Sequence, residues 1–197
     1  MTYHPDFFGR KDKPMRRDCE KRLEYMKPHV RGSLLDVGCS EGFFSFAFSG
    51  TCNPILAVDS EKRLIDLCLE TQKKYGTMID FVVGDIGKSI DKDFGIKWDT
   101  ILYMSIHHHV IARYGIKKAS EVIRWLSMSG KTMIFDMGQK NEKNCEKREW
   151  WNALPGTKDP AEWIRNYLRT NTEYKTIDRI GGTTVHGVER VLWKLTK

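Results

Sequence analysis

The chain has 197 residues, of which 40% are hydrophobic and 30% charged, so it can bury a core and is not a disordered protein. No stretch approaches 18 consecutive apolar residues, and the N-terminus lacks the pattern of a secretory signal, which excludes a transmembrane helix and a secretory leader from our expectations. Lys and Arg (33) exceed Asp and Glu (26), giving a net charge of +7, which fits a polyanionic partner as well as an ordinary basic enzyme.

The cysteines predict neither a disulfide framework nor a zinc site. Their number is odd, none belongs to a C-x-x-C pair, and their spacing does not bring four ligands together. We therefore expect reduced thiols in a cytoplasmic protein without a metal. The five are Cys19, Cys39, Cys52, Cys68 and Cys145.

Periodicity predicts a helix over 16–26, followed by strands that alternate with helices. Strands are predicted at 33–37, 54–59, 79–83, 98–104 and 132–135, and helices between them at 42–49, 62–75 and 117–126. A charged insertion (140–148), a helix (161–168) and a C-terminal hairpin (174–180 and 185–195, turning at Gly181-Gly182) complete the chain.

Alternation of strands and helices indicates right-handed βαβ units around a parallel sheet. The predicted fold is therefore α/β, with a single Rossmann-like doubly wound sheet that is mostly parallel. Its C-terminal hairpin is antiparallel, and helices cover both faces.

A glycine-containing loop, Asp36 to Gly42, follows the first predicted strand, and the second strand ends in Asp59. An acid at that place can accept both hydroxyls of an adenosine ribose. A dinucleotide fingerprint would need glycines where the chain has Ser40 and Phe43, and no Walker lysine is present. The loop therefore favours a nucleoside without a pyrophosphate, and disfavours NAD and ATP.

The loop, Leu34-Leu35-Asp36-Val37-Gly38-Cys39-Ser40-Glu41-Gly42, resembles the first motif of class I S-adenosylmethionine-dependent methyltransferases. Ala57-Val58-Asp59 is similar to their second motif and Val83-Gly84-Asp85-Ile86 to their third. The resemblance covers roughly residues 30 to 135, and the terminal hairpin is similar to that fold's reversed last strands. It implies an enzyme whose cofactor is S-adenosylmethionine.

The same resemblance nominates the residues that bind the cofactor. Gly38, Ser40 and Gly42 would line its methionine and ribose portions, and Asp59 would hold the ribose hydroxyls. The full set is Arg10, Asp36, Gly38, Ser40, Gly42, Phe43, Asp59, Ser60, Asp85, Ile86 and Met104.

The resemblance also places Asp85 with Ile86 at the edge and face of the adenine. Each acid has a structural alternative that the sequence leaves open. Asp36 can cap the turn that follows it, Asp59 can be a solvated acid at a strand end, and Asp85 can be a turn residue.

Three histidines, His107, His108 and His109, follow the fourth predicted strand. Adjacent side chains cannot all enter one cavity or converge on one metal ion, so we expect one histidine as a general base and the others in packing roles. The segment lacks the Asn/Asp-Pro-Pro-aromatic motif of adenine amino methylation. It also lacks the cysteine nucleophile of pyrimidine carbon-5 methylation.

A narrower resemblance connects Ser105-Ile106-His107-His108-His109, with Tyr114-Gly115, to two phosphate-methylating groups. These are the RNA methylphosphate-capping methyltransferases and the methyltransferase part of O-antigen chain terminators. Phe7-Phe8-Gly9-Arg10 resembles their lead-in, which implies that Arg10 approaches the cofactor's carboxylate. Because a phosphate oxygen is already anionic, groups that position it matter more than a strong base. Such groups are Arg10, Arg16, Arg17, His107, His108 and Arg113.

We expect residues 1–30 to form a helical lead-in of the same domain and residues 31–197 the methyltransferase domain. Within it, residues 137–170 form an insertion or cap on the acceptor side. Its tryptophans (Trp150, Trp151 and Trp163) stack on an acceptor or fill a small core. His186 is expected on the surface or at the pocket mouth.

The favoured hypothesis is O-methylation of a phosphate or hydroxyl acceptor by direct in-line methyl transfer. The preferred acceptor is a terminal phosphate of RNA or of a glycan. A small-molecule methyltransferase is the first alternative. A non-catalytic S-adenosylmethionine-binding or nucleic-acid-binding module is the second.

Overall fold

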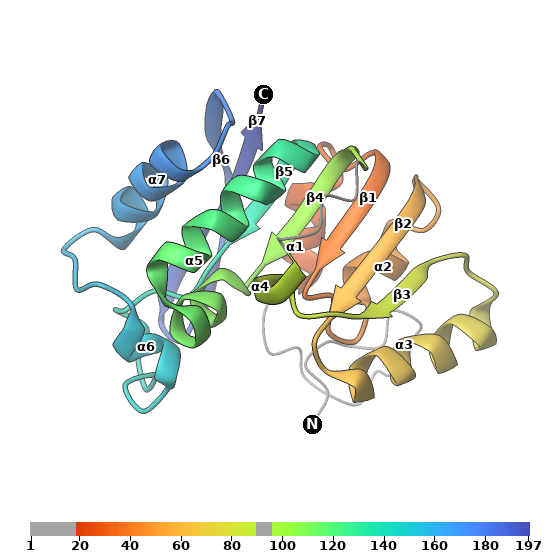
Figure 1. Ribbon diagram of the computed structural model, residues 1–197, viewed down its shortest axis with the longest axis horizontal. Helices are drawn as coiled ribbons and strands as arrows, with labels where there is room; N and C mark the ends of the chain where they lie inside the picture. Colours follow the sequence, from red (N-terminus) through yellow and green to blue (C-terminus); the bar gives the residue numbers. More distant parts are fainter. Residues whose placement is uncertain (1–18, 90–95) are drawn as a thin grey trace.

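The computed structural model describes residues 19–89 and 96–197 (Figure 1). The predicted lead-in is thus described only from Cys19, and Arg10, Arg16 and Arg17 lie outside the described residues. The helices are α1 (Cys19–Met26), α2 (Phe43–Ala47), α3 (Lys62–Tyr75), α4 (Ile86–Ser89), α5 (His107–Ser129), α6 (Glu149–Ala153) and α7 (Pro160–Asn171). The strands are β1 (Gly32–Val37), β2 (Cys52–Asp59), β3 (Asp80–Val83), β4 (Trp98–Met104), β5 (Gly130–Asp136), β6 (Thr176–Val185) and β7 (Val188–Thr196).

The strands form one sheet in the order β3-β2-β1-β4-β5-β7-β6. Strands β1 to β5 pair in parallel, and β7 runs antiparallel to both β5 and β6. The predicted strands at 33–37, 54–59, 79–83, 98–104 and 132–135 correspond to β1 to β5. The predicted α/β fold, a mostly parallel sheet with an antiparallel C-terminal hairpin, is confirmed.

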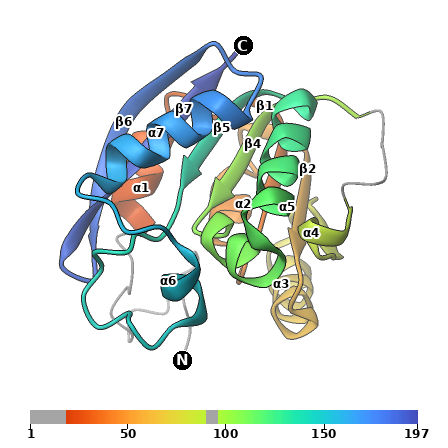
Figure 2. The ribbon, with the colours of Figure 1, turned by 60° about the vertical axis from the view of Figure 1, so that its left-hand side comes forward.

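Helices cover both faces of the sheet, as Figure 2 shows. Successive strand residues point to opposite faces, so Ile101 and Tyr103 of β4 join the core under α5, α6 and α7. Leu102 and Met104 join the core under α1, α2 and α3. A strand buried on both faces is apolar throughout, which is why the sequence predicts β4 with the observed bounds. Among the described residues, no helix has the length and apolar character needed to cross a membrane.

The C-terminal hairpin turns at a different place from the predicted one. Strand β6 continues through Gly181-Gly182, and the chain reverses at His186-Gly187, whose φ angles of 47° and 77° suit a tight two-residue turn. A Cβ atom on Gly181 would lie 2.4 Å from Cδ2 of Tyr25 in α1. The prediction of a turn at Gly181-Gly182 is therefore wrong, because the glycine serves the close approach of α1 to the sheet.

Helix α5 begins earlier than the predicted helix at 117–126, since it includes the three histidines. Gly115 has non-helical angles (φ 79°, ψ 161°) and divides the helix into two pieces. The second piece carries Val122, Ile123 and Leu126 into the core. The first piece lies over the carboxyl end of the sheet, where ligands bind in open α/β folds.

Candidate functional site

A cleft with two lobes lies at the carboxyl ends of β1, β2 and β4. The Asp85 lobe has a volume of about 190 Å³, and the Arg22 lobe has a volume of about 270 Å³. Four residues, Gly38, Asp59, Ile106 and His109, line both lobes. The two volumes together suit a small-molecule ligand of nucleoside size with an extended arm.

The loop after β1 adopts backbone conformations and close contacts that favour small residues. Gly38 has φ 77°, and a Cβ there would lie 2.2 Å from Cγ1 of Ile106, so a larger residue would push that side chain into the cleft. Ser40 also has a positive φ (54°), and its N–H donates to Oδ2 of Asp59 at 2.8 Å. The Oδ1 atom of Asp59 accepts from the N–H of Glu61 at 2.9 Å. Each carboxylate oxygen of Asp59 keeps a further lone pair for a ligand.

Asp36 lies under this loop and is 2% exposed, while still lining the Arg22 lobe. The hydroxyl of Ser45 donates to its Oδ2 at 2.6 Å. Burial raises the pKa of Asp36 to about 6, and the nearby charge of Asp59 acts in the same direction. This carboxyl is therefore a group that titrates just below neutral pH inside the cleft wall.

Two nominated residues of the loop do not line either lobe. Gly42 (φ 79°) turns the chain into α2, and a Cβ there would meet the ring of Phe46. Phe43 is 4% exposed and lies in the core under α1, α2 and α3. The neighbouring Phe44 lines the Arg22 lobe instead. Helical geometry accounts for this, since successive residues of a helix point about 100° apart.

The Asp85 lobe is polar at one end. The Tyr114 hydroxyl donates to Oδ2 of Asp85, and Nη1 of Arg113 lies 3.2 Å from the same oxygen. The N–H of Gly87 donates to Oδ1 at 3.0 Å. Ser60 and Ile86, both nominated from the sequence, line this lobe, and Met104 lines the other.

The structure separates the three adjacent histidines. His107 is fully buried, with Nδ1 3.3 Å from the Tyr103 hydroxyl and Nε2 3.0 Å from the Tyr167 hydroxyl. Burial lowers its pKa to about 3, so the ring stays neutral at physiological pH. His107 lines neither lobe and acts as a neutral packing and hydrogen-bonding group between β4, α5 and α7.

His108 is also buried, and its Nδ1 accepts from the N–H of Gly138 at 3.0 Å. Its ring packs edge-on against Trp150, with centroids 4.8 Å apart. His109 is exposed and lines both lobes of the cleft. Of the three candidates for a general base, the fold thus brings one to the cleft and buries the two others as structural groups.

The tryptophans of the predicted cap pack onto the protein rather than onto the cleft. Trp150 is 3% exposed in the core, and Trp151 and Trp163 are partly buried against it. Trp163 stacks on Tyr167 with ring centroids 5.3 Å apart. They line neither lobe, which agrees with the interpretation that they fill a small core.

A buried arginine that the sequence does not predict as a site residue lines the larger lobe. Arg22 of α1 is 2% exposed, and its Nη2 lies 2.9 Å from Oδ2 of Asp136 at the end of β5. Its Nε donates to the hydroxyl of Thr183 at 3.2 Å. The signal for it is its position among Cys19, Leu23 and Met26, on the buried face of α1.

A second buried arginine extends this network across the sheet. Arg190 of β7 donates from Nε and Nη2 to the two oxygens of Glu142, at 2.6 and 2.7 Å. Its Nη1 donates to the hydroxyl of Ser105 at 3.2 Å, and that hydroxyl donates to Oδ1 of Asp136 at 2.9 Å. Where Arg22 and Ser105 line the larger lobe, its wall is therefore backed by a chain of buried ion pairs.

Known proteins match both the sequence and the fold. A family model described as "Methyltransferase domain" matches residues 34–130. The O-antigen chain terminator bifunctional methyltransferase/kinase WbdD of Escherichia coli is 24% identical over 185 residues, which cover 88% of this chain and 25% of WbdD. The chain thus spans about a quarter of that relative's length. The ribosomal protein L11 methyltransferase of Thermosipho melanesiensis is 25% identical over 142 residues, which cover 66% of this chain and 51% of that protein.

Solved structures share the architecture. A crystal structure of WbdD aligns with a TM-score of 0.78 at 22% identity, covering 99% of this chain and 44% of that chain. Magnesium protoporphyrin IX methyltransferase from Synechocystis PCC 6803, solved with bound S-adenosylhomocysteine, aligns with a TM-score of 0.65 at 18% identity, covering 90% of this chain and 81% of that one. Residues 34–130 thus match a methyltransferase domain, the solved structures share its fold, and the motifs together with these matches support a class I, S-adenosylmethionine-dependent methyltransferase.

Proposed function

We propose that this chain transfers a methyl group from S-adenosylmethionine to an oxygen, with a terminal phosphate as the leading acceptor. The observation that carries the proposal is the position of His109, which lines both lobes of the cleft and is exposed. A group at the junction of the lobes can contact an acceptor at the point where the nucleoside and its amino-acid arm meet.

The residues of the cleft suit such a cofactor. Asp59 has its two oxygens fixed by backbone N–H groups and turned to the boundary of the lobes, where it would accept the ribose hydroxyls. Asp85 and Ile86 would meet the adenine in the smaller lobe. Arg22 would face the carboxylate of the cofactor's methionine portion in the larger lobe. The family resemblance in the sequence implies this role for Arg10.

The reaction then depends on positioning. When bound, the cofactor supplies an electrophilic methyl group on a sulfonium. His109 would hold the acceptor oxygen in line with the bond that breaks, by donating to a phosphate oxygen or by taking the proton of a hydroxyl. An anionic phosphate oxygen needs no proton removal, so a neutral or a charged imidazole can serve it. The buried ion pairs beside the cleft keep this wall in one geometry.

The similarity to the O-antigen chain terminator makes a glycan the first acceptor to test. We would incubate the protein with methyl-labelled S-adenosylmethionine and an oligosaccharide ending in a phosphate. The same oligosaccharide without phosphate and a 5′-phosphorylated RNA are the matched acceptors. Label in the phosphorylated glycan alone supports the proposal, whereas label in the unphosphorylated one favours a hydroxyl acceptor. Transfer to RNA that falls steeply with salt favours RNA.

Cofactor binding is tested separately by calorimetric titration with S-adenosylhomocysteine. Asp59→Ala should weaken binding about 100-fold, since two charge-assisted hydrogen bonds of about 1.5 kcal/mol each are lost. Asp66→Ala is the matched control, because Asp66 is an exposed acid of α3 that lines neither lobe. Absence of binding to the folded wild-type protein would refute the methyltransferase function.

A further inference from the structure

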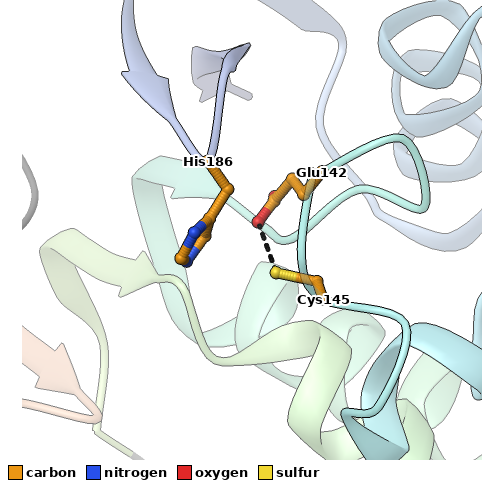
Figure 3. Close-up of side chains that lie close together, drawn as sticks. All are labelled: Glu142, Cys145 and His186. Carbon is orange, nitrogen blue, oxygen red and sulfur yellow. Dashed lines mark hydrogen bonds between the residues drawn. The ribbon is translucent and has the colours of Figure 1, made fainter.

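Three different metal-ligating side chains converge where the hairpin tip meets the segment after β5. One ligand atom from each of Glu142, Cys145 and His186 lies within 4.8 Å of the others. Figure 3 shows the imidazole of His186 beside the carboxylate of Glu142, with the sulfur of Cys145 close to the same carboxylate. The Sγ of Cys145 is 4.0 Å from Oε2 of Glu142.

The backbone brings these groups together from distant parts of the sequence. Glu142 and Cys145 are three residues apart, separated by Asn144 with φ 59°, so one tight turn presents both. His186 occupies the turn between β6 and β7, with φ 47°. The N–H of Lys143 donates to the carbonyl of His186 at 2.9 Å, which fixes the hairpin tip against the turn.

Glu142 retains coordinating capacity although it is paired with Arg190. Its Oε1 accepts from the N–H of Gln139 at 2.8 Å and from Nε of Arg190 at 2.6 Å. Its Oε2 accepts one strong bond, from Nη2 of Arg190 at 2.7 Å, besides the weak one from the Cys145 thiol. An ionised carboxylate has about four lone-pair sites, and three strong donors occupy three of them, which leaves one on Oε2 for the site. Carboxylates that bind metals are commonly held in this way by a second hydrogen-bonding group.

We propose that Glu142, Cys145 and His186 form a site for a divalent cation of the zinc class. A thiolate, an imidazole and a carboxylate are the donors that Zn²⁺ takes, at about 2.0–2.3 Å, and a water molecule would complete the tetrahedron. The ligand atoms lie within 4.8 Å of one another, whereas ligands at these bond lengths in a tetrahedron are about 3.3–3.7 Å apart. Binding would therefore require small movements of both the hairpin tip and the turn at residues 142–145. On binding, the Cys145 thiol gives its proton to solvent and its sulfur bonds to the metal, so no electrons are transferred.

The ion would join the hairpin tip to the turn at residues 142–145. Through Glu142 it would also hold Arg190, whose guanidinium donates to Ser105 in the wall of the Arg22 lobe. The site would therefore stabilise the wall of the Arg22 lobe, while the reacting atoms lie elsewhere. This inference is independent of which acceptor the enzyme methylates.

The test is titration of the full, reduced chain with Co²⁺, which reports thiolate ligation through an intense near-ultraviolet absorption. We expect one Co²⁺ per chain, displaced by Zn²⁺, and a higher melting temperature with Zn²⁺ present. Cys145→Ser should abolish the thiolate absorption. His186→Asn, which tolerates the left-handed backbone, should weaken binding at least about tenfold.

All five cysteines lie in the described residues, are buried and form no disulfide, so a control cysteine is needed. Cys52→Ser, in β2 and far from the cluster, should leave the titration unchanged. The proposal is wrong if the folded wild-type protein shows no thiolate absorption, if Cys145→Ser keeps it, or if His186→Asn binds Co²⁺ as tightly as wild type. Because His186 is exposed, its variant decides the question even if Cys145→Ser does not fold.

Discussion

The two walls of the cleft are built in different ways. The loop wall, made of Gly38, Ser40 and Asp59, is held by backbone N–H groups that donate to a carboxylate 19 positions away or fewer. The ion-pair wall consists of Arg22 and Ser105, which line the cleft, and of Asp136, Glu142 and Arg190 behind them. The hydrogen bonds of the Ser105 hydroxyl join it to residues 31 to 85 positions away in the sequence. A cofactor site can thus be specified by a short local motif, whereas the opposite wall exists only when the whole sheet is assembled.

The largest expected effect comes from breaking the ion-pair wall. Asp136→Asn should lower the free energy of unfolding by about 3–5 kcal/mol, because it leaves the charge of Arg22 buried without its partner. Asp178→Asn is the matched control, since its partner Lys194 is 3.6 Å away and the Asp178 side chain is 54% exposed. That control should cost less than about 1 kcal/mol. Urea denaturation measures both, and equal losses would contradict the contrast between the walls.

The junction of the walls is tested by His109→Gln. We expect the rate of methyl transfer to fall about 100-fold, the usual lower range for loss of a group that moves or shares a proton. The dissociation constant for S-adenosylhomocysteine should change far less. His29→Gln is the control, because His29 precedes β1 at the opposite end of the sheet. Unchanged turnover in His109→Gln would remove His109 from the reaction.

The loop wall makes stability depend on pH through Asp36. Its pKa is about 6 in the folded protein against 3.8 when unfolded, so the folded state holds the proton more tightly. The stabilisation that the folded state gains from binding this proton is complete below pH 3.8 and is lost as the pH rises through 6. The difference in unfolding free energy between wild type and Asp36→Asn should therefore fall by about 2–3 kcal/mol between pH 4 and 7. Denaturant titrations at several pH values measure it, and a difference that rises with pH would refute the assignment.

A smaller effect tests how α1, which carries Arg22, is docked. Gly181→Ala should cost about 1–2 kcal/mol, because its Cβ would lie 2.4 Å from the Tyr25 ring. The control is Gly156→Ala, where a Cβ meets no atom within 4 Å. Adding Tyr25→Ala to Gly181→Ala should relieve the clash, so the double variant should lose less than the sum of the single variants. Thermal unfolding of the wild type, the three single variants and the double variant measures these effects.

The same contrast explains what the sequence could predict. The strands β1, β4 and β5 are predictable because a strand buried on both faces is a short apolar run. The edge strand β3 is also apolar, although Val82 and Val83 are exposed. The loop wall is predictable because its glycines and acids are adjacent to these runs. The first piece of α5 cannot be predicted in this way, since three consecutive histidines carry no helical periodicity.

The ion-pair wall was missed for a tertiary reason. The position of Arg22 on one face of α1 with Cys19, Leu23 and Met26 indicates that it is buried. Nothing local indicates that it pairs with Asp136, or that Arg190 pairs with Glu142, because these acids are far away in sequence. Likewise, Gly181-Gly182 has the composition of a turn, and only the packing of Tyr25 shows why glycine is needed there. Local patterns thus predict elements and their loops, whereas contacts between distant elements decide the rest.

The break in α5 at Gly115 gives the fold a modular character. Residues 107–114 line the cleft through His109, Arg113 and Tyr114, while His107, His108, Val110 and Ile111 of the same piece are buried. Since the glycine takes up the change of direction, the cleft-lining residues can vary without repacking the second piece of the helix. Exchanging these three residues, with the buried ones kept, would change the surface that the cleft presents on an unchanged scaffold.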